Sequence, residues 1–106
     1  MSDKGLYLKL KKTLSDLYGN RLVGIVLYGS EARGEAKADS DIDLMVLLRG
    51  PVDSGRELRP IINAIYDIQL ETEPFRPISV IAVDVEVYQK QEFSLLQRVK
   101  QEGMPL

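Results

Sequence analysis

The chain has 106 residues, of which 44% are hydrophobic and 28% charged, with a formal net charge of -2 and neither cysteine nor histidine. This length and composition predict a single globular domain over residues 1–106. The missing residue types exclude disulfides, thiolate zinc sites and histidine acid–base chemistry, and the charge balance argues against general nucleic-acid binding. No apolar stretch approaches the roughly 18–20 residues of a membrane span. We therefore expect a cytoplasmic protein with no membrane partner.

Hydrophobic periodicity predicts alternating helices and strands. In chain order, the expected elements are a helix within Met1–Gly19, strands over Leu22–Tyr28 and Asp41–Leu48, a helix within Gly55–Glu71, a strand over Ile78–Val83 and a helix in the later part of Val85–Glu102. This order predicts an α/β fold, in which a small mixed β-sheet has helices packed on one face.

Two features of this plan stay open at the sequence level. Pro60 breaks a helix interior, so either the second helix begins near Arg59 or Gly55–Arg59 forms a separate irregular turn. The apolar C-terminal segment Val99–Leu106 packs either on the core or on another subunit, which leaves the oligomeric state open.

A polar loop between the first two expected strands begins with Gly29-Ser30 and is followed by Asp41 and Asp43. A Gly-Ser turn exposes backbone N–H groups and lacks side-chain bulk, so an anion can approach the main chain. Asp41 and Asp43 are two residues apart on the expected strand, so their carboxylates project from one face. A divalent cation relieves their repulsion, and Mg²⁺ typically takes one or two carboxylates plus phosphate oxygens. The pattern predicts a phosphate-binding turn beside a divalent-metal site.

Each of these residues also has a purely structural interpretation. Gly29-Ser30 alone suits a turn whose serine caps a short helix that starts at Ser30. Asp41 alone suits a cap or turn, and Arg33 alone suits a structural ion pair. Asp43 is harder to explain in this way, because an unpaired carboxylate within an apolar strand is costly. The joint occurrence of these residues at this spacing favours the functional interpretation.

Three blocks carry a resemblance to a known family. They are Gly29-Ser30, the A-R-G sequence at 32–34 and the S-D-I-D-L sequence at 40–44, with ten residues between Ser30 and Asp41. Together they resemble the signature of the DNA polymerase beta-like nucleotidyltransferase superfamily. More narrowly, the segment is similar to the minimal nucleotidyltransferase (MNT) proteins, which are often encoded beside HEPN-domain partners.

The resemblance implies transfer of a nucleoside monophosphate from a triphosphate, with ATP favoured, to an acceptor hydroxyl. It implies that Asp41 and Asp43 are the catalytic metal ligands for Mg²⁺, with two ions expected, and that Gly29 and Ser30 contact the β- and γ-phosphates. Arg33 is a further nucleotide-binding candidate, which pairs with phosphate or braces the loop. In toxin–antitoxin pairs of this type, the MNT antitoxin adenylylates a HEPN toxin, so a HEPN-domain protein is the implied partner.

One departure from the family pattern concerns a third carboxylate, which active members usually carry on the strand after the second helix. When Ile78–Val83 is aligned with that strand, Ser79 occupies the position of the carboxylate. Asp84 lies five positions further on, so its side chain is expected on the opposite face. Because a hydroxyl is a poor Mg²⁺ ligand, we expect the second ion to be weakly held and nucleotide binding to survive better than transfer.

Two functions therefore compete. The first is an active nucleotidyltransferase that transfers a nucleoside monophosphate, with AMP favoured. The second is an MNT-like binding module that docks a HEPN-type partner and performs little or no chemistry. No residue pattern identifies the nucleotide base or the acceptor, which is a protein hydroxyl, an RNA end or a small molecule.

Overall fold

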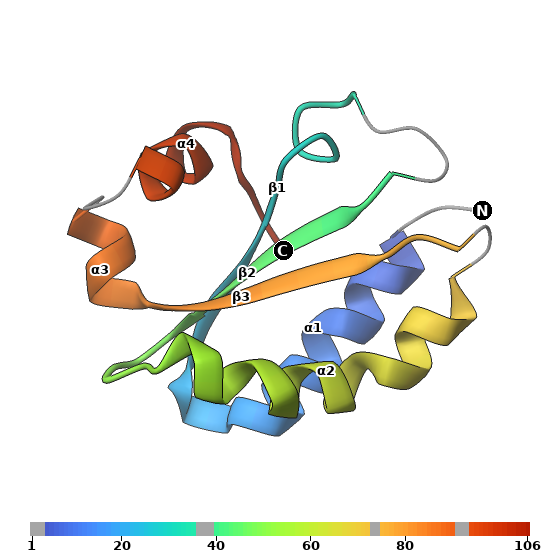
Figure 1. The fold of residues 1–106 in the computed structure, drawn as a ribbon, viewed down its shortest axis with the longest axis horizontal. Coiled ribbons are helices and arrows are strands. Elements are labelled where there is room, and N and C mark those ends of the chain that lie inside the picture. Colours follow the sequence, from blue (N-terminus) through green and yellow to red (C-terminus); the bar gives the residue numbers. More distant parts are fainter. Residues whose placement is uncertain (1–3, 36–39, 73–74, 91–93) are drawn as a thin grey trace.

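A computed structural model of the chain describes residues 4–35, 40–72, 75–90 and 94–106 (Figure 1). The elements in chain order are α1 (Lys4–Tyr18), the 3-10 turn η1 (Gly19–Arg21), β1 (Leu22–Tyr28), β2 (Ile42–Leu48), α2 (Ser54–Glu71), β3 (Ile78–Asp84), α3 (Val85–Lys90), α4 (Ser94–Glu102) and β4 (Met104–Pro105). Within these ranges, no helix is long and apolar enough to cross a membrane.

The four strands form one mixed sheet in the order β3-β2-β1-β4. β1 pairs antiparallel with both β2 and β4, whereas β2 pairs parallel with β3. A parallel pair needs a long crossover connection, and α2 supplies it between β2 and β3. As a result, the start of β3 lies beside the start of β2, where the expected acid pair is located.

Side chains alternate between the two faces of the sheet, and each face has its own apolar cluster. The cluster under α1 and α2 comprises Leu10, Leu14, Ile25, Leu27, Ile42, Leu44, Val46, Leu48, Ile61, Ile65, Ile68 and Ala82. The cluster on the other face comprises Val26, Met45, Leu47, Val83, Leu96 and Val99, of which the last two come from α4. Figure 1 shows the same division, with α1 and α2 on one side of the strands and α4 on the other.

The predicted α/β class with a small mixed sheet is confirmed. The two long helices lie on one face, as expected. The short α4 differs from that expectation, because Leu96 and Val99 pack against Met45 and Leu47, which point to the opposite face of β2.

The strand boundaries agree closely with the sequence pattern. β1 spans Leu22–Tyr28 as predicted, and β3 extends one residue further than predicted, to Asp84. β2 begins at Ile42, so Asp41 lies just before the strand. The N-terminal helix is described from Lys4, and its first three expected residues lie outside the described part of the chain.

Both expectations for the start of α2 were wrong. The helix begins at Ser54 and continues through Pro60 without a break. The Asp53 carboxylate caps it by accepting a hydrogen bond from the Arg56 amide at 3.2 Å. An ion pair of 2.9 Å between Glu57 and Arg21 adds a second attachment in the first turns. These contacts fix the first turns of the helix, which precede Pro60. Because proline has no backbone N–H group, one helical hydrogen bond is missing there.

The C-terminal region contains two elements that the periodicity did not indicate. α3 is one short helix, in which the Asp84 carboxylate accepts a hydrogen bond from the Glu86 amide at 2.8 Å. After α4, Met104 pairs with Leu27 and makes β4 an edge strand. Leu106 packs against the cluster under α1 and α2. Of the two options for Val99–Leu106, the structure shows packing on the chain's own sheet.

Candidate active site

Three polar side chains occupy neighbouring strands at one end of the sheet face that carries α4. Tyr28 of β1 is paired with Asp43 of β2, and Asp43 is paired with Ser79 of β3. By strand alternation they point to the same face as Met45, two residues further along β2. Ser79 is exposed and the other two are partly buried. The row is therefore open to solvent, beyond the region that α4 covers.

Gly29 lies directly against the Asp43 carboxylate. Its backbone has φ +73°, a conformation that L side chains rarely adopt, and a Cβ built at this position would overlap the Asp43 carboxylate. Only glycine fits such a position without strain. The group that approaches Gly29 in the structure is the Asp43 carboxylate, and the approach of a phosphate to this turn stays a prediction.

The segment after Gly29 forms a hydrogen-bonded turn and not the expected short helix. The amide of Arg33 donates to the Gly29 carbonyl at 3.2 Å, and the amide of Glu35 donates to the Ser30 carbonyl at 2.9 Å. Gly34 has φ +72°, which a right-handed helix does not allow. Ser30 is partly buried in the first position after Gly29.

Asp41 and Asp43 are close enough to influence each other. Burial raises the pKa of Asp43 above its ordinary value, the negative charge of Asp41 raises it further, and the positive charge of Arg33 lowers it. Asp41 itself is exposed. The raised pKa of Asp43 beside the negative charge of Asp41 marks a place where a cation is electrostatically favoured. Asp43 lies in β2 and Asp41 lies just before it, and their role as metal ligands stays a prediction.

Arg33 makes two ion pairs. Its Nε atom lies 3.2 Å from a Glu35 carboxylate oxygen, and its Nη1 atom lies 3.6 Å from a carboxylate oxygen of Glu102 at the end of α4. The guanidinium thus links the loop to α4 while its charge acts on Asp43. These contacts match the bracing role that the sequence left open, and they keep Arg33 beside the acid pair.

The register of β3 places Ser79, and no carboxylate, opposite Asp43. Asp84 is paired with Leu48 at the far end of the same strand and caps α3, so it does not replace the missing acid. Among the residues that the structure describes, no three His, Cys, Asp or Glu side chains are grouped so that they could hold a metal ion. Two carboxylates fit one Mg²⁺ whose remaining ligands are phosphate and water oxygens, and they under-ligate a second ion.

Sequence reasoning missed a buried polar cluster on the other side of the loop. The Glu31 carboxylate accepts hydrogen bonds from the Tyr7 hydroxyl at 2.6 Å and from Arg76 Nη1 at 2.8 Å. The Arg76 side chain also donates from Nε to the Ser40 carbonyl at 2.8 Å. These partners are 24 to 45 residues apart in the chain, and no local pattern signals contacts of that range.

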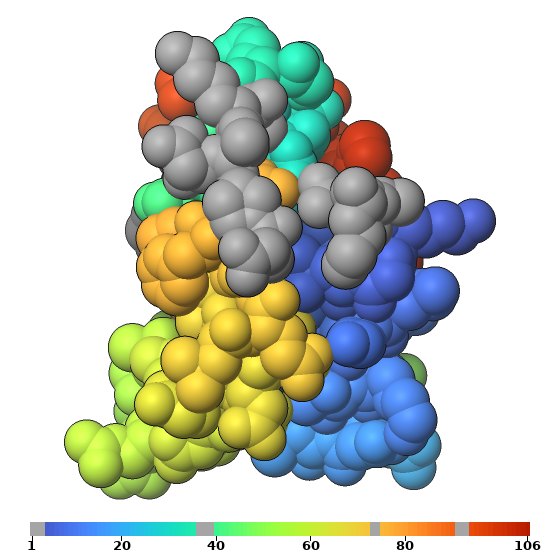
Figure 2. All heavy atoms as spheres, turned by 90° about the vertical axis from the view of Figure 1, so that its right-hand side faces the viewer, coloured from blue at the N-terminus to red at the C-terminus, as the bar shows by residue number. Residues whose placement is uncertain are grey.

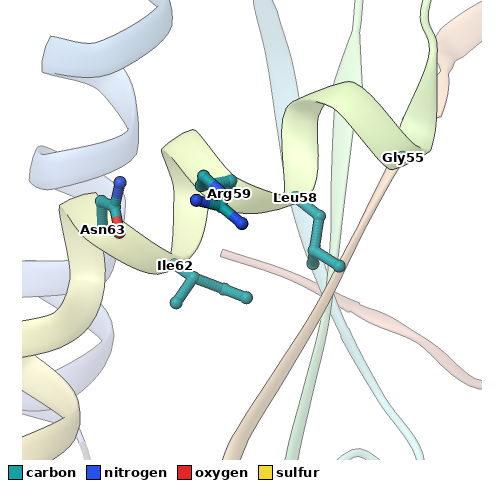
Figure 3. A pocket seen from close by; sticks show the side chains of 5 residues that line it. All are labelled: Gly55, Leu58, Arg59, Ile62 and Asn63. Carbon is teal, nitrogen blue, oxygen red and sulfur yellow. The ribbon is translucent and has the colours of Figure 1, made fainter.

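A separate surface hollow lies on α2, which packs on the opposite face of the sheet from Asp43. Its lining residues are Gly55, Leu58, Arg59, Ile62 and Asn63 (Figure 3). None of the residues predicted for the nucleotide site lines it.

The architecture and the site belong to a class of proteins in which a glycine turn and an acid pair lie side by side at one end of the central strands of a mixed sheet. Comparison with known proteins specifies the class. The sequence profile described as the nucleotidyltransferase domain matches residues 8–105, nearly the whole chain. The chain therefore belongs to the nucleotidyltransferase domain family. No curated protein sequence matches it.

Two solved structures share the fold. Spectinomycin adenyltransferase AAD(9) from Enterococcus faecialis, crystallised with ATP and spectinomycin, is 23% identical with a TM-score of 0.62 over 83% of this chain. This chain corresponds to only 35% of the length of that enzyme. A toxin–antitoxin structure with AMP-PNP is 23% identical with a TM-score of 0.59, over 92% of this chain and 69% of that one. At this level of identity, both similarities show a shared fold.

Proposed function

We propose that the domain binds a nucleoside triphosphate with Mg²⁺ between the Gly29-Ser30 turn and the acid pair, and transfers the nucleoside monophosphate to an acceptor hydroxyl. ATP is the favoured nucleotide. The single observation that carries the proposal is the contact of Gly29 with Asp43, because it joins the phosphate turn to the acid pair in one open site. Family membership supports the same reaction class.

The proposed division of labour follows from the positions of the side chains. Asp41 and Asp43 would hold Mg²⁺, which when bound neutralises charge on the triphosphate. The backbone N–H groups after Gly29 would bind the β- and γ-phosphates, and Arg33 would add positive charge at the same place. The acceptor oxygen would bond to the α-phosphorus as pyrophosphate leaves. The open row of Tyr28, Asp43 and Ser79 gives that acceptor access to the site.

The structures that share the fold support the choice of adenine nucleotide and of partner. One of them contains ATP and the other AMP-PNP, and the second is a toxin–antitoxin assembly. Together with the resemblance to MNT proteins, this favours AMP as the transferred group and a HEPN-domain toxin as the acceptor. The chain would then act as an antitoxin that modifies its partner.

The Asp43–Ser79 pairing favours a second candidate function. With a hydroxyl in place of the third carboxylate, the acceptor is poorly activated while the nucleotide is still held. In that case the domain is a nucleotide-binding module that docks a HEPN-type partner and inhibits it by binding alone.

A labelling experiment separates the two candidates. The domain, with its HEPN partner from the same cell, is incubated with Mg²⁺ and ATP labelled at the α- or the γ-phosphate. Transfer of AMP labels the partner from α-labelled ATP only, and Asp41→Asn with Asp43→Asn removes the label. The binding-module function predicts no label, together with inhibition of the partner that both substitutions leave intact. Equal labelling from the γ-phosphate would overturn the proposed reaction.

A further inference from the structure

Arg76 is the one charged side chain that is fully buried within the described part of the chain, with 7% of its surface exposed. It lies in the segment between α2 and β3, far from the acid pair in sequence. Its Nη1 atom is 2.8 Å from a carboxylate oxygen of Glu31, whose side chain is also largely buried, at 13% exposure. Its Nε donates to the Ser40 carbonyl at 2.8 Å. One guanidinium therefore contacts both ends of the loop between β1 and β2.

The contacted residues are direct neighbours of the candidate site. Glu31 follows Ser30, and Ser40 precedes Asp41. Because a peptide unit is rigid, a tether on one residue restricts the position of the next. The Tyr7 hydroxyl of α1 adds a second bond to Glu31, at 2.6 Å. The start and the end of the loop between β1 and β2 are thus both hydrogen-bonded to the buried Arg76 side chain.

Arg76 is itself fixed at its main chain. Its amide donates to the Thr72 hydroxyl at 3.1 Å, and its carbonyl accepts from the Gln69 side-chain amide at 2.6 Å. The Gln69 side-chain oxygen also accepts from the Ile78 amide at 2.6 Å, which ties the same region to the start of β3. Figure 2 views this side, where the end of α2 (yellow) lies between α1 (blue) and the start of β3 (orange). The main chain of Arg76 is therefore fixed in place.

A buried ion pair adds little net stability to a fold, because its desolvation is costly and apolar side chains of the same volume commonly stabilise the fold as well. A guanidinium orients its partners, because its N–H donors have a fixed planar geometry. We propose that Arg76 is a positioning residue, which holds Glu31 and Ser40 so that Ser30 and Asp41 face Asp43. This inference rests on the proposed function, because it names what arranges that nucleotide site.

The test compares substitutions at the tether for their effect on binding and on folding. Arg76→Met with Glu31→Gln removes both charges, so no buried charge is left without its partner. We expect a melting temperature near that of wild type and an affinity for Mg²⁺–AMP-PNP that is weaker by at least about tenfold, since displacements of about 1 Å are costly at such sites. Lys9→Met with Glu71→Gln removes an exposed ion pair outside the loop and is the matched control, with near-normal affinity.

Amide hydrogen exchange provides a readout that does not need nucleotide. In the double variant, exchange should rise in the peptides over residues 29–35 and 40–42, while the interior of β2 stays protected. Arg76→Lys keeps the charge but lacks the planar set of donors, so the protein should fold and bind Mg²⁺–AMP-PNP more weakly than wild type. This variant replaces the double variant if the latter does not fold.

The outcomes distinguish the inference from the proposed function. Wild-type affinity in the folded double variant, or an equal rise of exchange throughout the chain, would overturn the positioning role. If wild type binds no Mg²⁺–AMP-PNP, the proposed function fails, and the exchange measurement alone then decides whether Arg76 holds the loop. Weak binding with local exchange supports both.

Discussion

Asp43 and Ser79 are direct partners across the parallel strands β2 and β3. On one strand the residue is an acid whose pKa is raised by burial and by Asp41, and on the other it is an exposed hydroxyl. The proposed metal site thus has carboxylates on one side only. Because of this asymmetry, we expect nucleotide binding to survive better than nucleotidyl transfer.

Ser79→Asp should increase nucleotidyl transfer. A third carboxylate at this position would face Asp43 and complete the ligands of a second ion. We expect the transfer rate from α-labelled ATP to rise by at least about tenfold, which corresponds to about 1.4 kcal/mol of barrier. Without metal, the added negative charge should lower the melting temperature, and Mg²⁺ should restore it. Ser79→Ala is the control and should change neither quantity appreciably.

Gly29→Ala should be more damaging than Gly34→Ala. Both glycines have positive φ, +73° and +72°, but only at Gly29 would a Cβ meet the Asp43 carboxylate. Each substitution should cost about 1–2 kcal/mol for the backbone conformation. Gly29→Ala should in addition displace Asp43 and remove most Mg²⁺-dependent affinity for AMP-PNP. Urea unfolding and calorimetry measure the two effects, and equal affinities in the two variants would contradict the close approach.

Much of this arrangement was predictable because it depends on local pattern and parity. The apolar runs that end at Tyr28 and begin at Ile42 define two strands. The position of Ser79 follows from the resemblance, because aligning Ile78–Val83 with the family strand that carries the third carboxylate places Ser79 at the position of that carboxylate, and the structure pairs it with Asp43. Strand alternation then correctly excluded Asp84. The definition of the strands and the exclusion of Asp84 need only the period of a strand and the position of turn residues.

The parts that were missed depend on contacts between distant residues. Arg76 meets Ser40 across 36 positions and Glu31 across 45, and its flanking prolines give no sign of burial. The short β4 pairs with β1, which is distant in sequence, and its two residues are too few to give a periodicity signal. Pro60 is tolerated because Asp53 and Glu57 anchor the helix before it. In each case tertiary contacts outweigh local preference.

Arg33→Ala should distinguish phosphate binding from bracing. Its ion pairs with Glu35 and Glu102 are partly exposed, so their loss should cost less than about 1 kcal/mol of stability. If Arg33 binds phosphate, the variant should weaken AMP-PNP binding several-fold, whereas Glu102→Gln should leave the affinity unchanged. Equal losses in both variants, measured by calorimetry, would indicate that bracing through α4 is the main role.

Asp43→Asn should stabilise the metal-free domain at neutral pH. Because the pKa of Asp43 is raised in the folded state, the folded protein keeps this proton longer than the unfolded chain as pH rises from the ordinary value of 3.8. The contribution of the Asp43 carboxyl to the free energy of unfolding therefore falls as the pH rises from 3.8 to the raised pKa, and it stays low at higher pH. In EDTA, we expect the variant to melt a few degrees higher than wild type at neutral pH.

The stabilisation that we expect from Asp43→Asn should disappear at low pH. Below the ordinary Asp pKa of 3.8 the carboxyl is protonated in both states, so the advantage of the variant should vanish. A difference in melting temperature that is constant from acid to neutral pH would contradict the assigned electrostatics. Asp53→Asn provides a comparison at a helix cap outside the site.

The most direct test of the central claim is a crystal structure with Mn²⁺ and AMP-PNP, in which anomalous scattering locates the metal. We predict an Mn²⁺ ion bound by Asp41 and Asp43, with the β- and γ-phosphates at the Gly29-Ser30 turn and at most weak occupancy for a second ion near Ser79. Nucleotide bound elsewhere on the domain, or phosphates at the turn with no ion at the two aspartates, would contradict it.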